Sequence, residues 1–220
     1  MAFIYTIAQL KDLSALADLQ SKFFLGEESI AKALDLSEDL YRKYVTLMLP
    51  LSIRRTMTYI ALDQARGKIV GLAVDFPQTL SDEELPAFPN EISQFLAQLS
   101  TVFKKLERPL KQYAAWRKGK CARTMFIGVD KPYRRMGVAT ALQNYSEENS
   151  KKLGFEMLIS DAINIKSEKT FLRCGFQAIS RVEYKSCGLP GFSRLSGTCT
   201  LMLKLLVPQT SEEKSKTVYG

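Results

Sequence analysis

The sequence predicts an α/β protein, with a mixed β-sheet and helices on both of its faces. Strand and helix patterns alternate along the second half of the chain, and a hairpin pattern precedes them. The 220 residues include 46% hydrophobic residues, enough for one well-packed core and few for two. We therefore expect one domain over residues 1–207, followed by a polar tail, 208–220, that we expect to be disordered.

The first third of the chain carries one strand pattern and two helix patterns. Residues 3–7 predict a short strand. Asp12 is placed to cap a helix that runs towards Phe24, and Ser37 is placed to cap another. Pro50 should end this second helix, because proline removes a backbone donor and restricts the residue before it.

Periodicity and turn residues predict the remaining elements. In order, these are a hairpin (57–62 and 69–76), an amphipathic helix (92–103), a strand (124–129), a helix (137–153), a strand (156–160), a short helix (165–174) and two strands (176–184 and 198–207). Residues 80–120 differ in composition and pattern from the segments on either side, and we interpret them as a helical insertion over the core.

Composition excludes several chemistries. The chain has no histidine, which rules out Ser-His-Asp and Cys-His catalysis and histidine-ligated metals, and its four cysteines form no C-x-x-C pair. No apolar run reaches the ~20 residues that cross a bilayer, so we expect a cytoplasmic protein without membrane contact. The net charge of +8 suits an anionic ligand, although a solvated basic surface would look the same.

A candidate anion site lies in the stretch VDKPYRRMGVATAL, residues 129–142. Arg134 and Arg135 precede Gly137, where a helix is expected to begin. The first amides of a helix have no intrahelical acceptor, and their partial positive charge favours a phosphate. A small residue at 137 would let a pyrophosphate approach the main chain. The alternative is an ordinary helix start with exposed arginines.

Two spaced motifs resemble the coenzyme A signature of the GCN5-related N-acetyltransferase (GNAT) family. The first is Arg134-x-x-Gly137-x-Ala139, after the strand FIGV and the turn DKPY. The second, Asn164-x-x-Ser167-x-x-x-Phe171, ends in a Gly-Phe pair. The resemblance covers residues 120–207 well. It implies a mostly antiparallel seven-stranded sheet, splayed open between 124–129 and 156–161.

The resemblance also implies acetyl-CoA as cofactor. It assigns the contacts with that cofactor to Ile127, Gly128, Val129, Arg134, Arg135, Met136, Gly137, Val138, Ala139, Thr140, Asn164, Ser167 and Phe171. Main-chain amides of the strand, including that of Val129, would hold the acetyl carbonyl. Gly128 would mark a bulge that turns these amides towards the cofactor, or would be an ordinary strand glycine.

The segment SKFFLGEESIAKAL, residues 21–34, resembles the substrate-binding entry of the dopamine/arylalkylamine N-acetyltransferases. By this resemblance Glu28 is the general base and Glu27 the preceding acid, although Ser29 replaces that subgroup's proline. Two glutamates near a helix start could instead favour the helix dipole. Phe24, Glu27 and Tyr41 are the expected substrate contacts.

Many members of the wider family carry a tyrosine, proposed as general acid, at position 171. Phe171 cannot donate a proton, so Ser167 is our candidate, with Cys174, Tyr184 or an unprotonated thiolate as alternatives. Ser167 could equally bind the cofactor phosphate or face solvent.

The resulting hypothesis is an acetyl-CoA-dependent N-acetyltransferase. The acceptor would be a small arylalkylamine of the dopamine, tyramine, octopamine, serotonin or tryptamine type, attacking directly in a ternary complex. The alternatives are a polyamine, another small amine or a protein amino group as acceptor, or a non-catalytic CoA-binding protein. We expect no nucleic-acid partner, and a monomer or weak homodimer.

Overall fold

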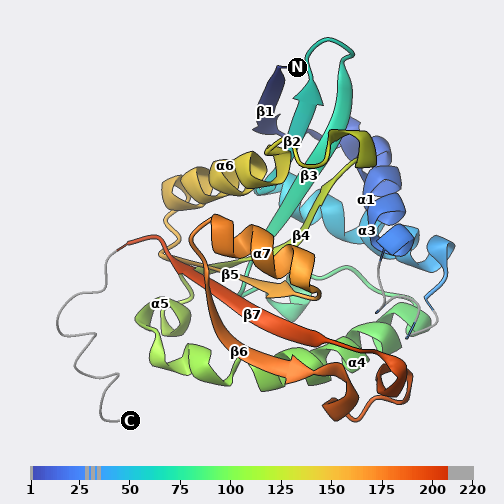
Figure 1. Ribbon diagram of the computed structural model, residues 1–220, viewed down its shortest axis with the longest axis vertical. Coiled ribbons are helices and arrows are strands. Elements are labelled where there is room, and N and C mark those ends of the chain that lie inside the picture. Colours follow the sequence, from blue (N-terminus) through green and yellow to red (C-terminus); the bar gives the residue numbers. More distant parts are fainter. Residues whose placement is uncertain (1, 28–29, 31–32, 34–35, 208–220) are drawn as a thin grey trace.

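The computed structural model describes residues 2–27, 30, 33 and 36–207. A single seven-stranded sheet, in the order β1-β2-β3-β4-β5-β7-β6, forms the centre of the molecule (Figure 1). Its strands are β1 (Phe3–Ile7), β2 (Thr58–Asp63), β3 (Lys68–Pro77), β4 (Cys121–Val129), β5 (Met157–Ala162), β6 (Gln177–Glu183) and β7 (Thr198–Leu205). Strands β4 and β5 pair in parallel, and the other neighbours pair antiparallel, which confirms the predicted mixed sheet.

Helices cover both faces of this sheet. They are α1 (Leu13–Glu27), α3 (Glu38–Arg54), α4 (Asn90–Leu106), α5 (Ala114–Arg117), α6 (Val138–Lys152) and α7 (Ile165–Arg173). Helices α1 and α3 pack on β2 and β3 through Leu72 and Val74, whereas Ala73, between them, faces α6. In the other half of the sheet, Met157 and Ile159 face α4, and Leu158 packs beside α7. The strand alternation therefore separates the two helical layers.

The predicted end of the second helix was wrong. Ser37 caps α3 as expected, since its Oγ accepts a hydrogen bond from the Leu40 amide at 3.2 Å. The helix nevertheless passes through Pro50 and continues to Arg54. An interior proline costs about 3 kcal/mol, but burying Leu49 and Ile53 stabilises the helix by roughly 1.5–3 kcal/mol each.

The start of the first helix also differs from the prediction. A 3-10 turn, Leu10–Asp12, leads into α1, and Gln9 holds the cap position. The Asp12 carboxylate accepts a hydrogen bond from the Gln9 amide at 2.8 Å. Asp12 thus closes a reciprocal pair inside the first turn instead of capping α1 from outside.

The sheet opens between β4 and β5. These strands pair only over Cys121–Thr124 and Met157–Ser160, and β4 then continues to Val129 paired with β3 but not with β5. This confirms the predicted splay. The bulge lies at Met125, because Thr124 pairs with Asp75 and Phe126 pairs with Val74.

Placing the bulge at Gly128 was therefore wrong. Gly128 pairs regularly with Leu72, and its lack of a side chain serves packing. A Cβ at this position would lie 2.5 Å from the Phe23 ring and 2.9 Å from the Phe126 ring. These two rings stack with centroids 6.5 Å apart. Glycine lets α1 approach β4 this closely.

A buried polar cluster lies beneath α6 at the point where the strands separate. Asp75 is fully buried and accepts hydrogen bonds from Ser146 and Thr124, while Gln143 donates to the Thr124 hydroxyl at 3.4 Å. Burial raises the pKa of Asp75 to about 7, despite these two hydrogen bonds. Its Oδ1 atom is buried without a hydrogen-bond partner among the described residues.

The raised pKa of Asp75 predicts a pH-dependent stability. The folded protein keeps a proton up to about pH 7, whereas the unfolded chain releases it near the ordinary value of 3.8. Stability should therefore fall as the pH rises through this window, by an amount on the order of 4 kcal/mol. We expect Asp75→Asn to lose much less stability than the wild type between pH 4 and pH 8, measured by denaturant unfolding.

Glu91→Gln, which changes an exposed acid on α4, is the control for a general loss of charge. Parallel stability–pH curves for the wild type and Asp75→Asn would contradict the assignment of this proton to Asp75.

Candidate functional site

The loop before α6 ends in a helix start of the kind that binds anions. Gly137 adopts φ 80°, a left-handed conformation that favours glycine. The Ala141 amide donates to the Gly137 carbonyl at 3.0 Å, so the amides of residues 138–140 precede the first helical hydrogen bond. Arg135 also has a positive φ, 63°, and its side chain is exposed. This geometry confirms the predicted helix start at Gly137.

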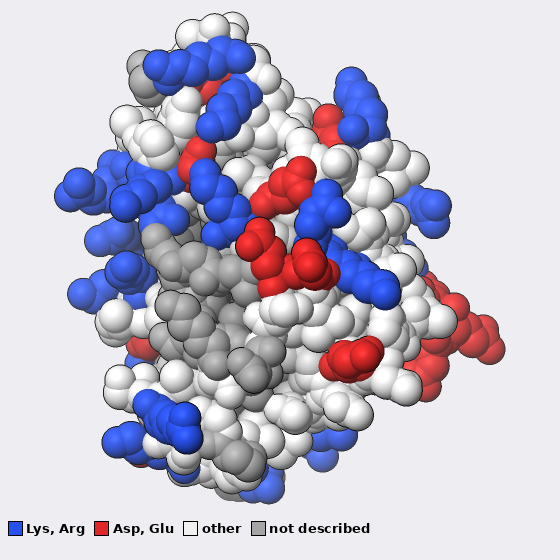
Figure 2. All heavy atoms as spheres, turned by 90° about the vertical axis from the view of Figure 1, so that its right-hand side faces the viewer, with Lys and Arg blue, Asp and Glu red and all other residues white. Residues whose placement is uncertain are grey.

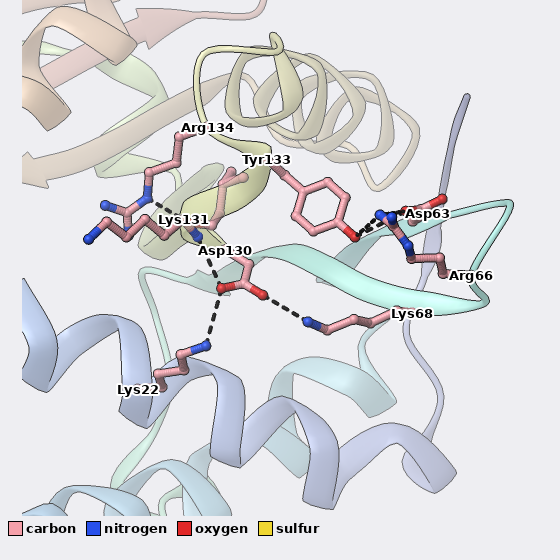
Figure 3. A network of polar contacts seen from close by, with 9 residues as sticks. Lys22, Asp63, Arg66, Lys68, Asp130, Lys131, Tyr133 and Arg134 are labelled. Carbon is pink, nitrogen blue, oxygen red and sulfur yellow. Dashed lines mark hydrogen bonds and ion pairs between the residues drawn. The ribbon is translucent and has the colours of Figure 1, made fainter. Parts of the chain in front are cut away.

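Asp130 fixes the beginning of this loop (Figure 3). Its carboxylate accepts hydrogen bonds from the Lys131 amide at 3.0 Å, from Lys22 of α1 at 3.2 Å and from Lys68 of β3 at 2.9 Å. Burial alone would raise the pKa of Asp130, but the hydrogen bonds from Lys68 and Lys22 outweigh it and hold the pKa below its ordinary value. Three separate elements are thus tied to one carboxylate.

Tyr133 and Arg134 fix the rest of the loop (Figure 3). The buried Tyr133 hydroxyl donates to Asp63 at 3.0 Å and accepts from Arg66 at 3.1 Å, so the β2–β3 hairpin holds the loop from one side. Arg134 donates to the Val129 carbonyl at 2.9 Å. Because these contacts hold the backbone in place, the amides at the start of α6 are arranged before any anion arrives.

Residues of the second motif have structural roles at the start and in the core of α7. The Asn164 side chain accepts from the amides of Lys166 at 3.0 Å and Ser167 at 2.9 Å, and the Ser167 hydroxyl donates to the Asn164 carbonyl at 2.8 Å. Phe171 is 2% exposed and packs edge-on against Phe176, with centroids 5.1 Å apart. The Asn164–Ser167 spacing is therefore that of a helix cap as well as that of the resembling cofactor motif.

An apolar cavity of about 250 Å³ lies on the opposite side of the opening from α6, between α3, α4 and strands β3–β5. Aromatic and aliphatic side chains dominate its wall, and one acid contributes to it. The lining residues are Gln20, Ile30, Tyr41, Tyr44, Val45, Met48, Leu49, Val74, Phe76, Phe95, Leu96, Leu99, Ser100, Phe103, Thr124, Met125, Asp161 and Ile163. The cavity therefore reaches the point where β4 and β5 diverge, at Thr124 and Asp161.

The predicted substrate residues are partly brought to this cavity. Tyr41 lines it, as does Tyr44, whose pKa burial raises to about 12. Phe23, which precedes Phe24 on α1, stacks on Phe126 and is absent from the cavity lining. Phe24 and Glu27 belong to α1, but their side chains, and the whole of Glu28, lie outside the described residues.

A buried charge cluster that was not predicted from the sequence lies beside the cavity. The guanidinium of Arg123, on β4, forms ion pairs with Asp161 of β5 and with Glu107. It also donates to Gln78 at 3.0 Å and lies 5.7 Å from the Phe103 ring centroid. An arginine inside the otherwise apolar strand pattern was the available signal, because a buried charge requires partners.

Acids and bases are unevenly distributed over the surface. On the face that carries α1 and α3, Lys and Arg gather along the left margin and the top of Figure 2, and acidic side chains gather near its centre. Among the described residues, no helix combines the length and apolarity needed to cross a bilayer. All four cysteines are described, and each is a buried free thiol.

The opened sheet, the helix start at Gly137 and the cavity that reaches the opening suit an enzyme that binds an anionic cofactor. Residues 16–176 match the Acetyltransferase (GNAT) family, and the chain belongs to that family. The family's acetyl donor is acetyl-CoA, which the amides at the start of α6, together with the small residues Gly137 and Ala139, are suited to hold by its diphosphate.

Several solved structures share the fold. A mosquito arylalkylamine N-acetyltransferase-like protein 5b is 20% identical, with a TM-score of 0.72 over 93% of this chain and 100% of that one. The C-terminal condensation domain of Ebony, solved with β-alanyl-dopamine, is 10% identical, with a TM-score of 0.76 over 93% and 99%. A Drosophila melanogaster polyamine N-acetyltransferase that forms N-acetylagmatine is 14% identical, with a TM-score of 0.70 over 93% and 100%. No curated protein matches the sequence.

The left-handed conformation of Gly137 predicts a specific loss of acetyl-CoA affinity on substitution. In Gly137→Ala the added Cβ meets nothing within 4 Å, so the cost is backbone strain of about 1–2 kcal/mol. Relief of that strain should move the amides of residues 138–140, and we expect the Kd for acetyl-CoA, measured by calorimetry, to rise about tenfold.

Gly154→Ala is the matched control, because Gly154 has φ 84°, equally open space and a position just beyond the C-terminal end of α6, away from Gly137. It should lose similar stability and keep its acetyl-CoA affinity. Equal affinities in the two variants would contradict a cofactor contact at Gly137.

Proposed function

We propose that this protein transfers the acetyl group of acetyl-CoA to the primary amine of a small arylalkylamine. The observation that carries the proposal is the aromatic cavity that ends where β4 and β5 diverge. A volume of about 250 Å³ is slightly below the range of about 300–1,000 Å³ typical of ligand pockets, and it suits one aromatic ring system with a short side chain. The rings of Tyr41, Tyr44 and Phe95 provide complementary faces.

The cavity and the helix start lie on opposite sides of the opened sheet. Beyond Thr124, the edge of β4 that faces β5 has no strand partner among the described residues, so its main-chain amides remain available, whereas the Val129 carbonyl accepts a hydrogen bond from Arg134. Acetyl-CoA would supply an activated thioester there. Amides of β4 would stabilise negative charge on the carbonyl oxygen, while the cavity would orient the amine for direct attack.

An amine panel tests this proposal. Thiol release from acetyl-CoA should occur with tryptamine, tyramine and dopamine, and should be at least tenfold slower, by kcat/KM, with agmatine, spermidine and a lysine peptide. Turnover preferentially with agmatine or spermidine would move the acceptor to the polyamines. Tight acetyl-CoA binding without turnover of any amine would contradict an enzymatic role.

We also propose Glu28 as the general base. An alkylamine with a pKa of ~10.4 is protonated at neutral pH and must lose a proton before it attacks. The support for Glu28 is the resemblance of its segment, together with its chain neighbours: α1 ends at Glu27, and Ile30 lines the cavity. Ser167 remains our candidate for proton return to the thiolate. The hydroxyls of Ser167 and Tyr184 each donate to a main-chain carbonyl, so this contact does not separate the two candidates, but Ser167 is partly exposed whereas Tyr184 is buried.

Glu28→Gln should lower kcat by about 100-fold at neutral pH and recover in part at high pH, where more of the amine is already deprotonated. The measurement is the pH–rate profile at saturating acetyl-CoA. Glu38→Gln, at the exposed start of α3, controls for a lost surface acid. A profile for Glu28→Gln that parallels the wild type would remove Glu28 from the mechanism.

A further inference from the structure

We infer that Asp161 binds the amino group of the acceptor and so selects amines over uncharged ligands. This inference rests on the function proposed above and names the residue that would recognise its substrate. It assigns Asp161 a binding role, separate from proton abstraction by Glu28.

Asp161 lies on β5 immediately after the last residue that pairs with β4. Ser160 forms the last pair of the parallel ladder, with Thr124, and Asp161 is the next residue along β5. Its side chain is 8% exposed and lines the cavity. Asp161 is the one acid among the described residues of the cavity wall, and it lies at the end that meets the opened strands.

The charges around Asp161 also favour a cationic ligand. Arg123 lies between Asp161 and Glu107, so two carboxylates share one guanidinium. Burial, with a further contribution from the charge of Asp161, raises the pKa of Glu107 above its ordinary value, although Arg123 opposes this shift. The three side chains formally carry one excess negative charge, which Lys104 opposes at Glu107, and a cation in the cavity would balance it beside Asp161.

The Asp161 carboxylate has one unsatisfied hydrogen-bond acceptor among the described residues. Asp161 Oδ2 accepts from Arg123, whereas Oδ1 is buried and has no hydrogen-bond partner among the described residues. A buried carboxylate oxygen without a donor is costly. A primary ammonium brings three donors on a compact group. The aromatic side chains of Tyr44, Phe95 and Phe103 in the same wall also favour a cation.

Glu107 provides a matched control for Asp161. Either residue, changed to its amide, leaves Arg123 paired with one remaining carboxylate, so the electrostatic cost to the fold is similar. Glu107 is absent from the cavity lining, and its side chain is 23% exposed. If the KM for the amine changes in the Asp161 variant and not in the Glu107 variant, the change therefore reports contact between Asp161 and the acceptor. A disturbance of Arg123 would affect both variants.

The test compares Asp161→Asn with Glu107→Gln, using tryptamine as acceptor and tryptophol as its uncharged analogue. Asp161→Asn should raise the KM for tryptamine by about 10- to 100-fold, the range expected for a hydrogen bond to a charged group. The Kd for tryptophol, from competition, and the Kd for acetyl-CoA should each change less than about threefold. Glu107→Gln should leave all three constants near wild type.

Two results would overturn the inference: an equal rise in the tryptamine KM for both variants, or an equal loss of tryptamine and tryptophol affinity in Asp161→Asn. If the wild type turns over no amine, the proposed function fails first. If it turns over tryptamine and Asp161→Asn does so equally well, only the role of Asp161 fails.

A second variant covers the case in which Asp161→Asn does not fold. Met125 lines the cavity and is 43% exposed, so Met125→Lys adds a cation to the same wall with Asp161 intact. We expect it to weaken tryptamine binding at least tenfold more than tryptophol binding. Equal weakening of the two ligands would again contradict recognition by charge.

Discussion

The structure depends on the early end of the β4–β5 ladder. Two features, one side-chain contact and one main-chain bulge, coincide with the end of this pairing at Thr124. The Ser160 hydroxyl donates to the Thr124 carbonyl at 2.9 Å, so a side chain occupies the acceptor that a continuing ladder could use. The bulge at Met125 then turns β4 relative to β3. Beyond this point the edge of β4 that faces β5 has no strand partner among the described residues, which a continuous sheet would not allow.

Each side of this opening carries a buried cluster of polar side chains. Beneath α6, Asp75 and Thr124 join β3, β4 and the helix through side-chain hydrogen bonds. Facing the cavity, Arg123 joins β4 to Asp161 of β5 where the strands part. Because both clusters are buried, their hydrogen bonds and ion pairs hold the strands in a defined separation. Each cluster keeps one buried carboxylate oxygen without a donor among the described residues, on Asp75 and on Asp161.

Local patterns were sufficient for much of the fold and for one half of the site. Gly137 and the helix after it were predicted because helix starts and left-handed glycines depend on a few adjacent residues. The Pro50 prediction failed because burial of Leu49 and Ile53 on the sheet outweighs a local preference. Of the two interpretations of Gly128, a bulge or an ordinary strand glycine, the sequence could not choose the second, because the Phe23 ring that requires glycine there lies about a hundred residues away in the chain.

The amino-acid order alone was enough to indicate the family, the helix start that suits a phosphate and the absence of histidine chemistry. These properties depend on residue type and short spacing. The cavity wall and the Arg123–Asp161–Glu107 cluster could be seen only after folding, because they join α3, α4, β4 and β5 from distant parts of the chain. Burial and charge balance at Asp161 depend on these non-local neighbours, and no local sequence pattern encodes them.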